Sequence, residues 1–344
     1  MKGKLARWAA APVHVAALAT GAKSFLDNPV IGSTKLNESG LHVARMRLAH
    51  RLADRRRARL AGMVSREDAA AFERNGFVLK ENFLPDFAQM EQEVLSLQAP
   101  ARQMIQGDTM TRRIALDRSA LARAPRVRAV LESPEWLGLI RYIGSSALQP
   151  IHYVQTIKSH VRNAPPDPQT NLHADTFHPT VKAWLFLTDV AEDEGPFVYV
   201  PGSHKLNPRR LAWERRKSIT AAKSPDRLSA RGSFRITPEE LGRLGYGTPT
   251  AFAVKKNTLV VADTGGFHAR GPSARPSTRI EIWAYGRRNP FLPWTGLDPA
   301  GFPFLRDRMV PLYWRALDFA ERLNLKRNPW RDAGVVSPDS EARV

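Results

Sequence analysis

The spacing of hydrophobic positions changes near the middle of the chain. Before about residue 150, apolar residues recur every three or four positions, as on one face of a packed helix. After Pro150, short segments rich in Val, Ile, Leu and aromatic residues follow one another, mostly bounded by Gly, Pro, Asn or Asp. We therefore predict strands over 151–161, 182–190, 197–201, 257–263 and 279–286.

The helices predicted in the first half have recognisable ends. Residues 41–60 alternate apolar residues with Arg at a loosely helical spacing, which predicts a basic amphipathic helix. Ser65, followed by Asp68, indicates the start of another helix, and Gly76 indicates its end. Residues 125–148 are also expected to be helical.

Strands in series, without a helix after each one, favour an antiparallel sandwich. We expect a mainly β core with flanking helices, of the α+β class. Residues 1–63 are expected to form a separate helical segment, 64–290 the main domain, and 291–344 a C-terminal helix and tail. The charged stretch 205–250 interrupts the strands, and we expect it to form a lid-like insertion over one mouth of the sandwich.

The composition narrows the kinds of site. The chain has 344 residues and no cysteine. Disulfides, zinc–thiolate sites, Cys-ligated clusters and a Cys nucleophile are therefore excluded. Any metal must be held by His and carboxylate side chains, and the chain has 9 His.

The formal net charge of +19 indicates an anionic partner, and basic residues crowd the first sixty positions. Residues 1–63 could pack on the main domain, attach to an anionic membrane surface, or bind nucleic acid. The first residues resemble a signal peptide, but Pro12 and His14 interrupt the apolar run. We expect a cytoplasmic protein, with peripheral membrane contact as the alternative.

The stretch Asn171–Thr176 carries the first candidate metal ligands. His173 and Asp175 are two positions apart, and in an extended segment such residues point to the same side. His268 follows the strand 257–263 across a Gly-Gly turn and is the best candidate for a third ligand. Two imidazoles and one carboxylate match the facial triad of Fe(II) oxygenases, which leaves positions open. The alternative is a surface loop with a hydrogen-bonded Asp.

Arg279 lies eleven residues after His268, at the start of a predicted strand. Such an Arg can form a bidentate pair with the distal carboxylate of 2-oxoglutarate. The alternative is an exposed Arg at a strand end. The order His-x-Asp, His, Arg favours the cofactor site.

Over roughly residues 65–290 the chain resembles the phytanoyl-CoA dioxygenase family of Fe(II)/2-oxoglutarate oxygenases. The resemblance is carried by Gly76-Phe77-Val78, His173-Ala174-Asp175, Glu194-Gly195-Pro196, Val200-Pro201-Gly202-Ser203-His204, His268 and Arg279. It implies a double-stranded β-helix (jelly-roll) fold. It also implies that His173, Asp175 and His268 hold Fe(II) and that Arg279 holds 2-oxoglutarate. Lys158, Gln155 and Thr264 would add polar contacts to this cofactor.

The resemblance further implies that O₂ oxidises 2-oxoglutarate to succinate and CO₂ while an unactivated C–H bond is hydroxylated. Asp175 favours hydroxylation, because related halogenases lack this carboxylate. Ala174 stands where the family often has Gln, so an acyl-CoA substrate is not assumed. We expect a small-molecule or lipid-like substrate, and the basic segments would suit an anionic one.

Two other functions stay open. An oxygenase acting on nucleic acid is disfavoured, because that branch carries a second Arg six residues after the cofactor Arg, where this chain has Tyr285. A catalytically inactive binding scaffold is disfavoured by the intact triad.

Overall fold

The computed structural model describes residues 11–286, 288–297, 303–325 and 327–342. The strands are β1 (Phe77–Lys80), β2 (Ala99–Gln106), β3 (Thr109–Ala115), β4 (Ile151–Lys158), β5 (Val181–Phe186), β6 (Phe197–Tyr199), β7 (Thr250–Phe252), β8 (Leu259–Asp263), β9 (His268–Arg270), β10 (Thr278–Gly286) and β11 (Arg331–Val336). The α-helices are α2 (Ala11–Ala16), α3 (Thr34–Glu38), α4 (Leu41–Leu60), α5 (Arg66–Asn75), α6 (Phe87–Leu95), α7 (Arg118–Ala122), α8 (Pro125–Glu132), α9 (Pro134–Ile143), α10 (Pro208–Thr220), α11 (Arg227–Ala230), α12 (Pro238–Leu244) and α13 (Pro303–Arg322).

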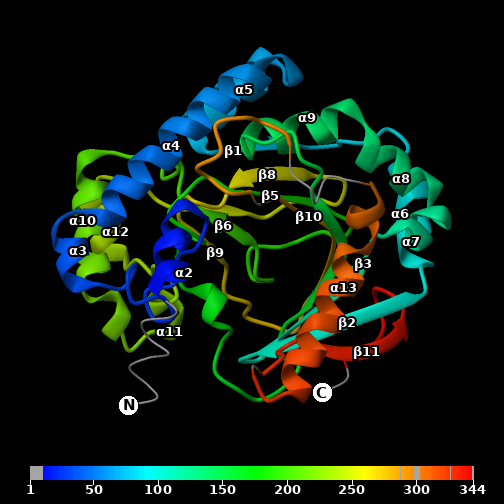
Figure 1. Cartoon of the computed structure of the whole chain (residues 1–344). Helices are drawn as coiled ribbons and strands as arrows, with labels where there is room; N and C mark the ends of the chain where they lie inside the picture. Colours follow the sequence, from blue (N-terminus) through cyan, green and yellow to red (C-terminus); the bar gives the residue numbers. More distant parts are fainter. Residues whose placement is uncertain (1–10, 287, 298–302, 326, 343–344) are drawn as a thin grey trace.

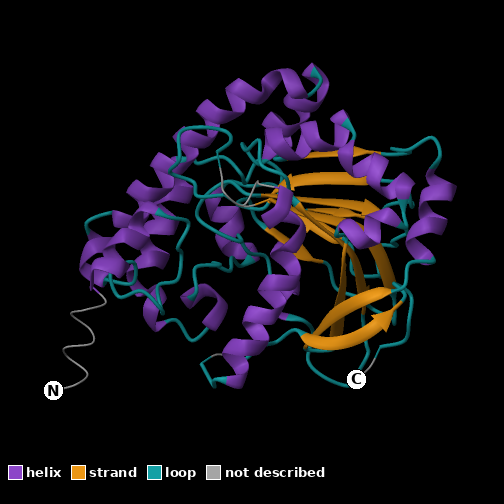
Figure 2. Ribbon diagram, turned by 45° about the vertical axis from the view of Figure 1, so that its right-hand side comes forward, coloured by secondary structure: helices purple, strands orange, loops and turns teal. Residues whose placement is uncertain are grey.

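The strands form two sheets with helices around them (Figures 1 and 2). The large sheet has the order β1-β8-β5-β10-β4-β3-β2-β11, and the small sheet has the order β7-β6-β9. Neighbouring strands in both sheets run antiparallel. The core is a double-stranded β-helix, so the predicted fold class is confirmed.

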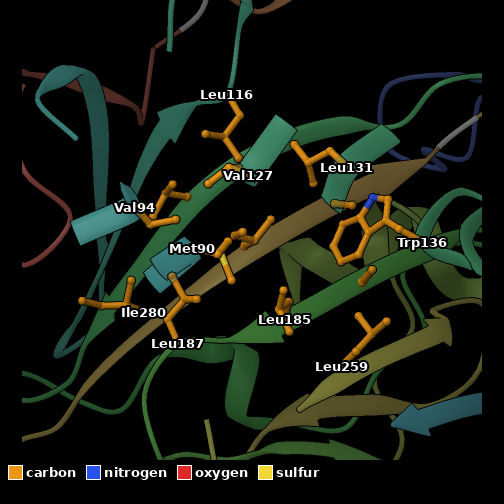
Figure 3. Packing of buried hydrophobic residues seen from close by; sticks show 14 of the residues in the cluster. Met90, Val94, Leu116, Val127, Leu131, Trp136, Leu185, Leu187, Leu259 and Ile280 are labelled. Carbon is orange, nitrogen blue, oxygen red and sulfur yellow. The ribbon is translucent and has the colours of Figure 1, made fainter. Parts of the chain in front are cut away.

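Successive side chains of a strand point to opposite sides, so the large sheet has two different faces. On β10, Ile280 and Ile282 pack with helices α6, α8 and α9, whereas Trp283 belongs to the cluster shared with the small sheet. Figure 3 shows the helix side, where Trp136 of α9 lies among the aliphatic side chains of the sheet. Burial of each large apolar side chain contributes about 1.5–3 kcal/mol, so this layer holds the sheet rigidly under the site.

Several helix ends lie where the sequence predicts them. Helix α4 spans the predicted Leu41–Leu60. The Ser65 hydroxyl accepts a hydrogen bond from the Asp68 amide at the start of α5. Gly76 ends α5 with a positive φ of 85°, a conformation that favours glycine.

Helix α4 packs beside α9 and α10 (Figure 1). Two of its arginines point inward: Arg45 donates to the backbone carbonyls of Leu18, Thr20 and Ala22, and Arg56 donates to those of Ser145, Pro290 and Leu292. In the described part of the chain, no helix is long and apolar enough to cross a lipid bilayer.

The C-terminal residues differ from the expected helix and tail. Helix α13 is present, but β11 then pairs with β2 and extends the large sheet by one strand. The hydrophobic pattern did not predict β11. Its pairing satisfies backbone groups of β2 that would otherwise lie on an exposed edge.

Candidate metal centre

Two backbone hydrogen bonds tie the candidate ligands together. The His173 amide donates to the His268 carbonyl, and the His268 amide donates to the His173 carbonyl, both at 2.9 Å. The two residues therefore stand directly opposite each other, as in an antiparallel ladder. Gly266 makes the turn before His268, and a Cβ on it would overlap the Tyr199 hydroxyl.

Three ligand atoms converge at this point. His173 Nε2 lies 3.8 Å from Asp175 Oδ1, and His268 Nε2 lies 3.7 Å from the same oxygen. Within the described ranges, these three residues are the one group of His, Cys, Asp or Glu side chains whose ligand atoms all lie within 4.8 Å of one another. The structure thus brings together the triad predicted from sequence.

The backbone fixes which nitrogen of each imidazole carries hydrogen. His173 Nδ1 lies 2.8 Å from the Asn171 carbonyl oxygen, and His268 Nδ1 lies 3.0 Å from the Gly266 carbonyl oxygen. Carbonyls only accept, so each Nδ1 must donate and each Nε2 presents a lone pair. Among the described residues, His268 Nε2 has no hydrogen-bond partner. Three acceptors that face one another in this way fit a bound cation.

The electrostatics keep all three groups ready to bind metal. Burial lowers the pKa of His173 well below its ordinary value and that of His268 to about 4, so both rings are neutral. Burial acts to raise the pKa of Asp175, but Lys182 and the two histidines outweigh it and hold this pKa well below its usual range. Lys182 Nζ contacts Asp175 Oδ2 at 2.6 Å and leaves Oδ1 facing the histidines.

The triad opens into a cavity of about 260 Å³. Its walls come from β2, β3, β4, β5, β9 and β10, and the lining includes Arg113, Gln155, Arg270, Arg279 and Trp283. Arg279 Nε lies 3.0 Å from Glu281 Oε2, and its Nη1 donates to the Gly195 carbonyl at 2.7 Å. Arg279 and Gln155, both predicted to contact the cofactor, therefore face the same space as the triad.

Two predicted cofactor contacts lie elsewhere. Lys158 lies four positions after Val154 on β4, so its side chain points to the same face of the sheet, away from the cavity. Its Nζ donates to the Asp339 carbonyl at 3.1 Å. Thr264 is buried beside the triad, and its carbonyl accepts from the Asp175 amide at 2.9 Å. Neither residue is part of the cavity lining.

Residues 72–237 match the family model described as "Phytanoyl-CoA dioxygenase (PhyH)". The matched part of the chain, just under half of it, is similar to this family. Its members are oxygenases that use Fe(II) and 2-oxoglutarate, and they act on small molecules. His173 and Asp175 lie inside the matched region, whereas His268 and Arg279 lie beyond its end, so their place at the site rests on the three-dimensional arrangement.

Solved structures with a similar chain course include other 2-oxoglutarate enzymes. HygX from Streptomyces hygroscopicus, with nickel and 2-oxoglutarate bound, is 18% identical, with 65% of this chain and 87% of that chain covered and a TM-score of 0.41. The carbocyclase SnoK from nogalamycin biosynthesis is 17% identical, with coverage of 66% and 84% and a TM-score of 0.41. EctD from S. alaskensis, with bound Fe, is 14% identical, with coverage of 65% and 76% and a TM-score of 0.37. No curated protein sequence matches the chain significantly.

Sequence reasoning missed four charged residues at or beside the cavity, namely Lys182, Arg113, Arg270 and Glu281. Lys182 follows the predicted metal motif closely, and it belongs to the predicted strand 182–190. It lies two positions before Trp184 in this strand, so its side chain points to the same side as this cavity-lining residue, and that spacing was the available signal.

Proposed function

We propose that this oxygenase hydroxylates an unactivated C–H bond of a small molecule, with Fe(II) held by His173, Asp175 and His268. The observation that carries the proposal is the convergence of two imidazole lone pairs and one carboxylate oxygen within 4.8 Å. A facial set of two His and one carboxylate suits non-haem Fe(II) and leaves positions for other ligands.

When bound, iron and 2-oxoglutarate supply the O₂-dependent oxidising chemistry, and the protein supplies positioning. Lys182 holds one oxygen of Asp175 and so orients the other toward the histidines. Arg279 and Gln155 face the cavity and are proposed to bind the far carboxylate of 2-oxoglutarate. For Lys158 and Thr264, which do not line the cavity, we propose structural roles instead.

The size of the cavity favours a small substrate. Its volume of about 260 Å³ lies near the lower end of ligand pockets, which commonly measure about 300–1,000 Å³. Aromatic walls such as Trp184, Phe197 and Trp283 would exclude water around the reacting carbon. This small volume supports a small molecule over a nucleic-acid strand.

The first test adds Fe(II) and 2-oxoglutarate to the purified protein without oxygen and records visible absorption. A weak charge-transfer band that requires both additions is expected in the wild type. It should weaken in His173→Ala and Arg279→Gln and persist in Arg275→Gln, a matched change at a half-exposed Arg paired with Asp193. The absence of the band from folded wild-type protein would leave the binding-scaffold alternative.

We also propose that α4 is the part of residues 1–63 that would contact an anionic membrane. Its outward face carries Arg47, Arg51, Arg55 and Arg59, four exposed arginines at intervals of four residues. Such a stripe attracts anionic surfaces by charge, and salt weakens the attraction. Flotation with anionic and neutral vesicles tests this, with Arg51→Gln/Arg55→Gln as the variant. Equal binding to both vesicle types would remove the membrane contact.

A further inference from the structure

Four cationic side chains line the cavity beside the triad, and three of them have a carboxylate partner. These pairs are Lys182–Asp175 at 2.6 Å, Arg270–Asp167 at 2.7 Å and Arg279–Glu281 at 3.0 Å. Arg113 is the fourth cation. Within the part of the chain that the structure describes, no carboxylate forms an ion pair with it.

Cross-strand register explains how Arg113 is held. It lies opposite Gln155 of β4, which in turn lies opposite Glu281 of β10. Arg113 Nε donates to Gln155 Oε1 at 2.8 Å, and Gln155 Nε2 donates to Glu281 Oε1 at 2.6 Å. The other oxygen of Glu281 contacts Arg279. Glu281 thus contacts Arg279 directly and reaches Arg113 only through the Gln155 amide. The network contains two guanidinium groups and one carboxylate, so it keeps one positive charge in excess.

Aromatic rings fix the Arg113 guanidinium at the cavity wall. Its central carbon lies 4.1 Å from the Trp283 ring centre and 4.7 Å from that of Trp330. Burial lowers the pKa of Arg113 to about 10, so the group is still charged at neutral pH. The part of Arg113 that stays exposed faces the cavity. A positioned and only partly hydrated guanidinium is suited to a carboxylate or phosphate ligand.

Arg113 and Arg279 reach the cavity from different strands. Strand β4 separates β3 from β10, so two strand spacings of about 4.8 Å place the backbones roughly 10 Å apart. If Arg279 holds the far carboxylate of 2-oxoglutarate, Arg113 is left for another anion in the same cavity.

We propose that Arg113 binds a carboxylate or phosphate group on the substrate itself, so that this enzyme oxidises an anionic small molecule. The inference rests on the proposed function, because it assigns the co-substrate to Arg279. It makes Arg113 the residue that sets substrate class.

The test is calorimetric titration of the anaerobic protein containing Fe(II) and saturating 2-oxoglutarate. The probes are benzoate and phenyl phosphate, with benzamide as the neutral match. At least one anion is expected to bind tenfold or more tightly than benzamide. Arg113→Gln should remove about tenfold to a hundredfold of that affinity, the loss expected for a charge-assisted hydrogen bond. Arg113→Lys should keep most of the preference for anions.

Two results would overturn the assignment. One is the absence of any preference for the anions in the wild type, or a preference that survives Arg113→Gln. The other is a 2-oxoglutarate affinity that falls as far in Arg113→Gln as in Arg279→Gln, since Arg113 would then bind the co-substrate. The titrations are repeated without 2-oxoglutarate. Failure of 2-oxoglutarate to bind the wild type refutes the proposed function separately, and the anion preference at Arg113 is still measured.

Discussion

Glu281 offers a direct test of how charge is balanced beneath the cavity. Its side chain is 0% exposed, it contacts Arg279 at 3.0 Å, and it accepts a hydrogen bond from Gln155 at 2.6 Å. Glu281→Gln keeps the shape and an acceptor oxygen but removes the negative charge. Arg279, which is also buried, would then lack its counterion in the metal-free protein.

Removal of one partner from a buried ion pair costs about 3–5 kcal/mol, because the other charge is left uncompensated. The Arg279 Nε–Glu281 Oε2 contact lacks hydrogen-bond alignment, and Arg279 also donates to the Gly195 carbonyl. We therefore expect the lower value, about 3 kcal/mol. That is a large part of the ~5–15 kcal/mol that stabilises a typical protein. At ~2 °C per kcal/mol for a large chain, the melting temperature should fall by about 6 °C.

Thermal unfolding of metal-free protein measures the effect, in a double-mutant cycle with Arg279→Met. The double variant should be more stable than Glu281→Gln alone, because no unpaired buried charge is left. Glu132→Gln is the control, since Glu132 pairs with Arg128 on the surface and its side chain is 61% exposed. A Glu281→Gln variant as stable as this control, or strictly additive changes in the cycle, would refute the reasoning.

Three further predictions concern the metal loop and three histidines whose pKa values are lowered by burial. Gly266→Ala should lower the melting temperature and the metal affinity together, because the turn has no room for a Cβ; a variant that unfolds and binds Co(II) like the wild type would contradict this. Lys182→Met should weaken metal binding by about 10- to 100-fold by releasing the carboxylate ligand, and unchanged Co(II) affinity in a titration would count against it. Burial lowers the pKa of His50 and His204 to about 3 and that of His268 to about 4, below the ordinary 6.5. The unfolded chain therefore takes up more protons, and metal-free stability should fall as pH drops from about 6.5 to 4; thermal scans that stay level would disprove the prediction.

The sequence predicts the triad because local geometry and strand order determine it. The two-residue spacing of His173 and Asp175 needs only an extended backbone, and His268 needs only a strand followed by a glycine turn. The Arg113–Gln155–Glu281 network could not be found in this way. It depends on register between three strands that lie far apart along the chain, and hydrophobic pattern does not specify register across such distances.

Two strands of the large sheet, β2 and β3, were not predicted, for a different physical reason. β2 and β3 carry inward-facing polar residues, such as Gln106 and Arg113, because their inner faces line a polar cavity and not an apolar core. Those residues break the alternation by which strands are recognised. A cavity wall therefore looks like a loop when only its sequence is read.

The paired backbone hydrogen bonds between His173 and His268 affect how the protein exchanges its metal. These ligands lie ninety-five residues apart in sequence, and closing so long a loop costs conformational entropy. Here folding meets that cost, because two backbone hydrogen bonds, and not the ligand side chains, hold the two residues opposite each other. Loss of metal is then a local event at three side chains, and not the start of unfolding. The enzyme should be able to lose its metal under chelation and recover it at the same site, without refolding.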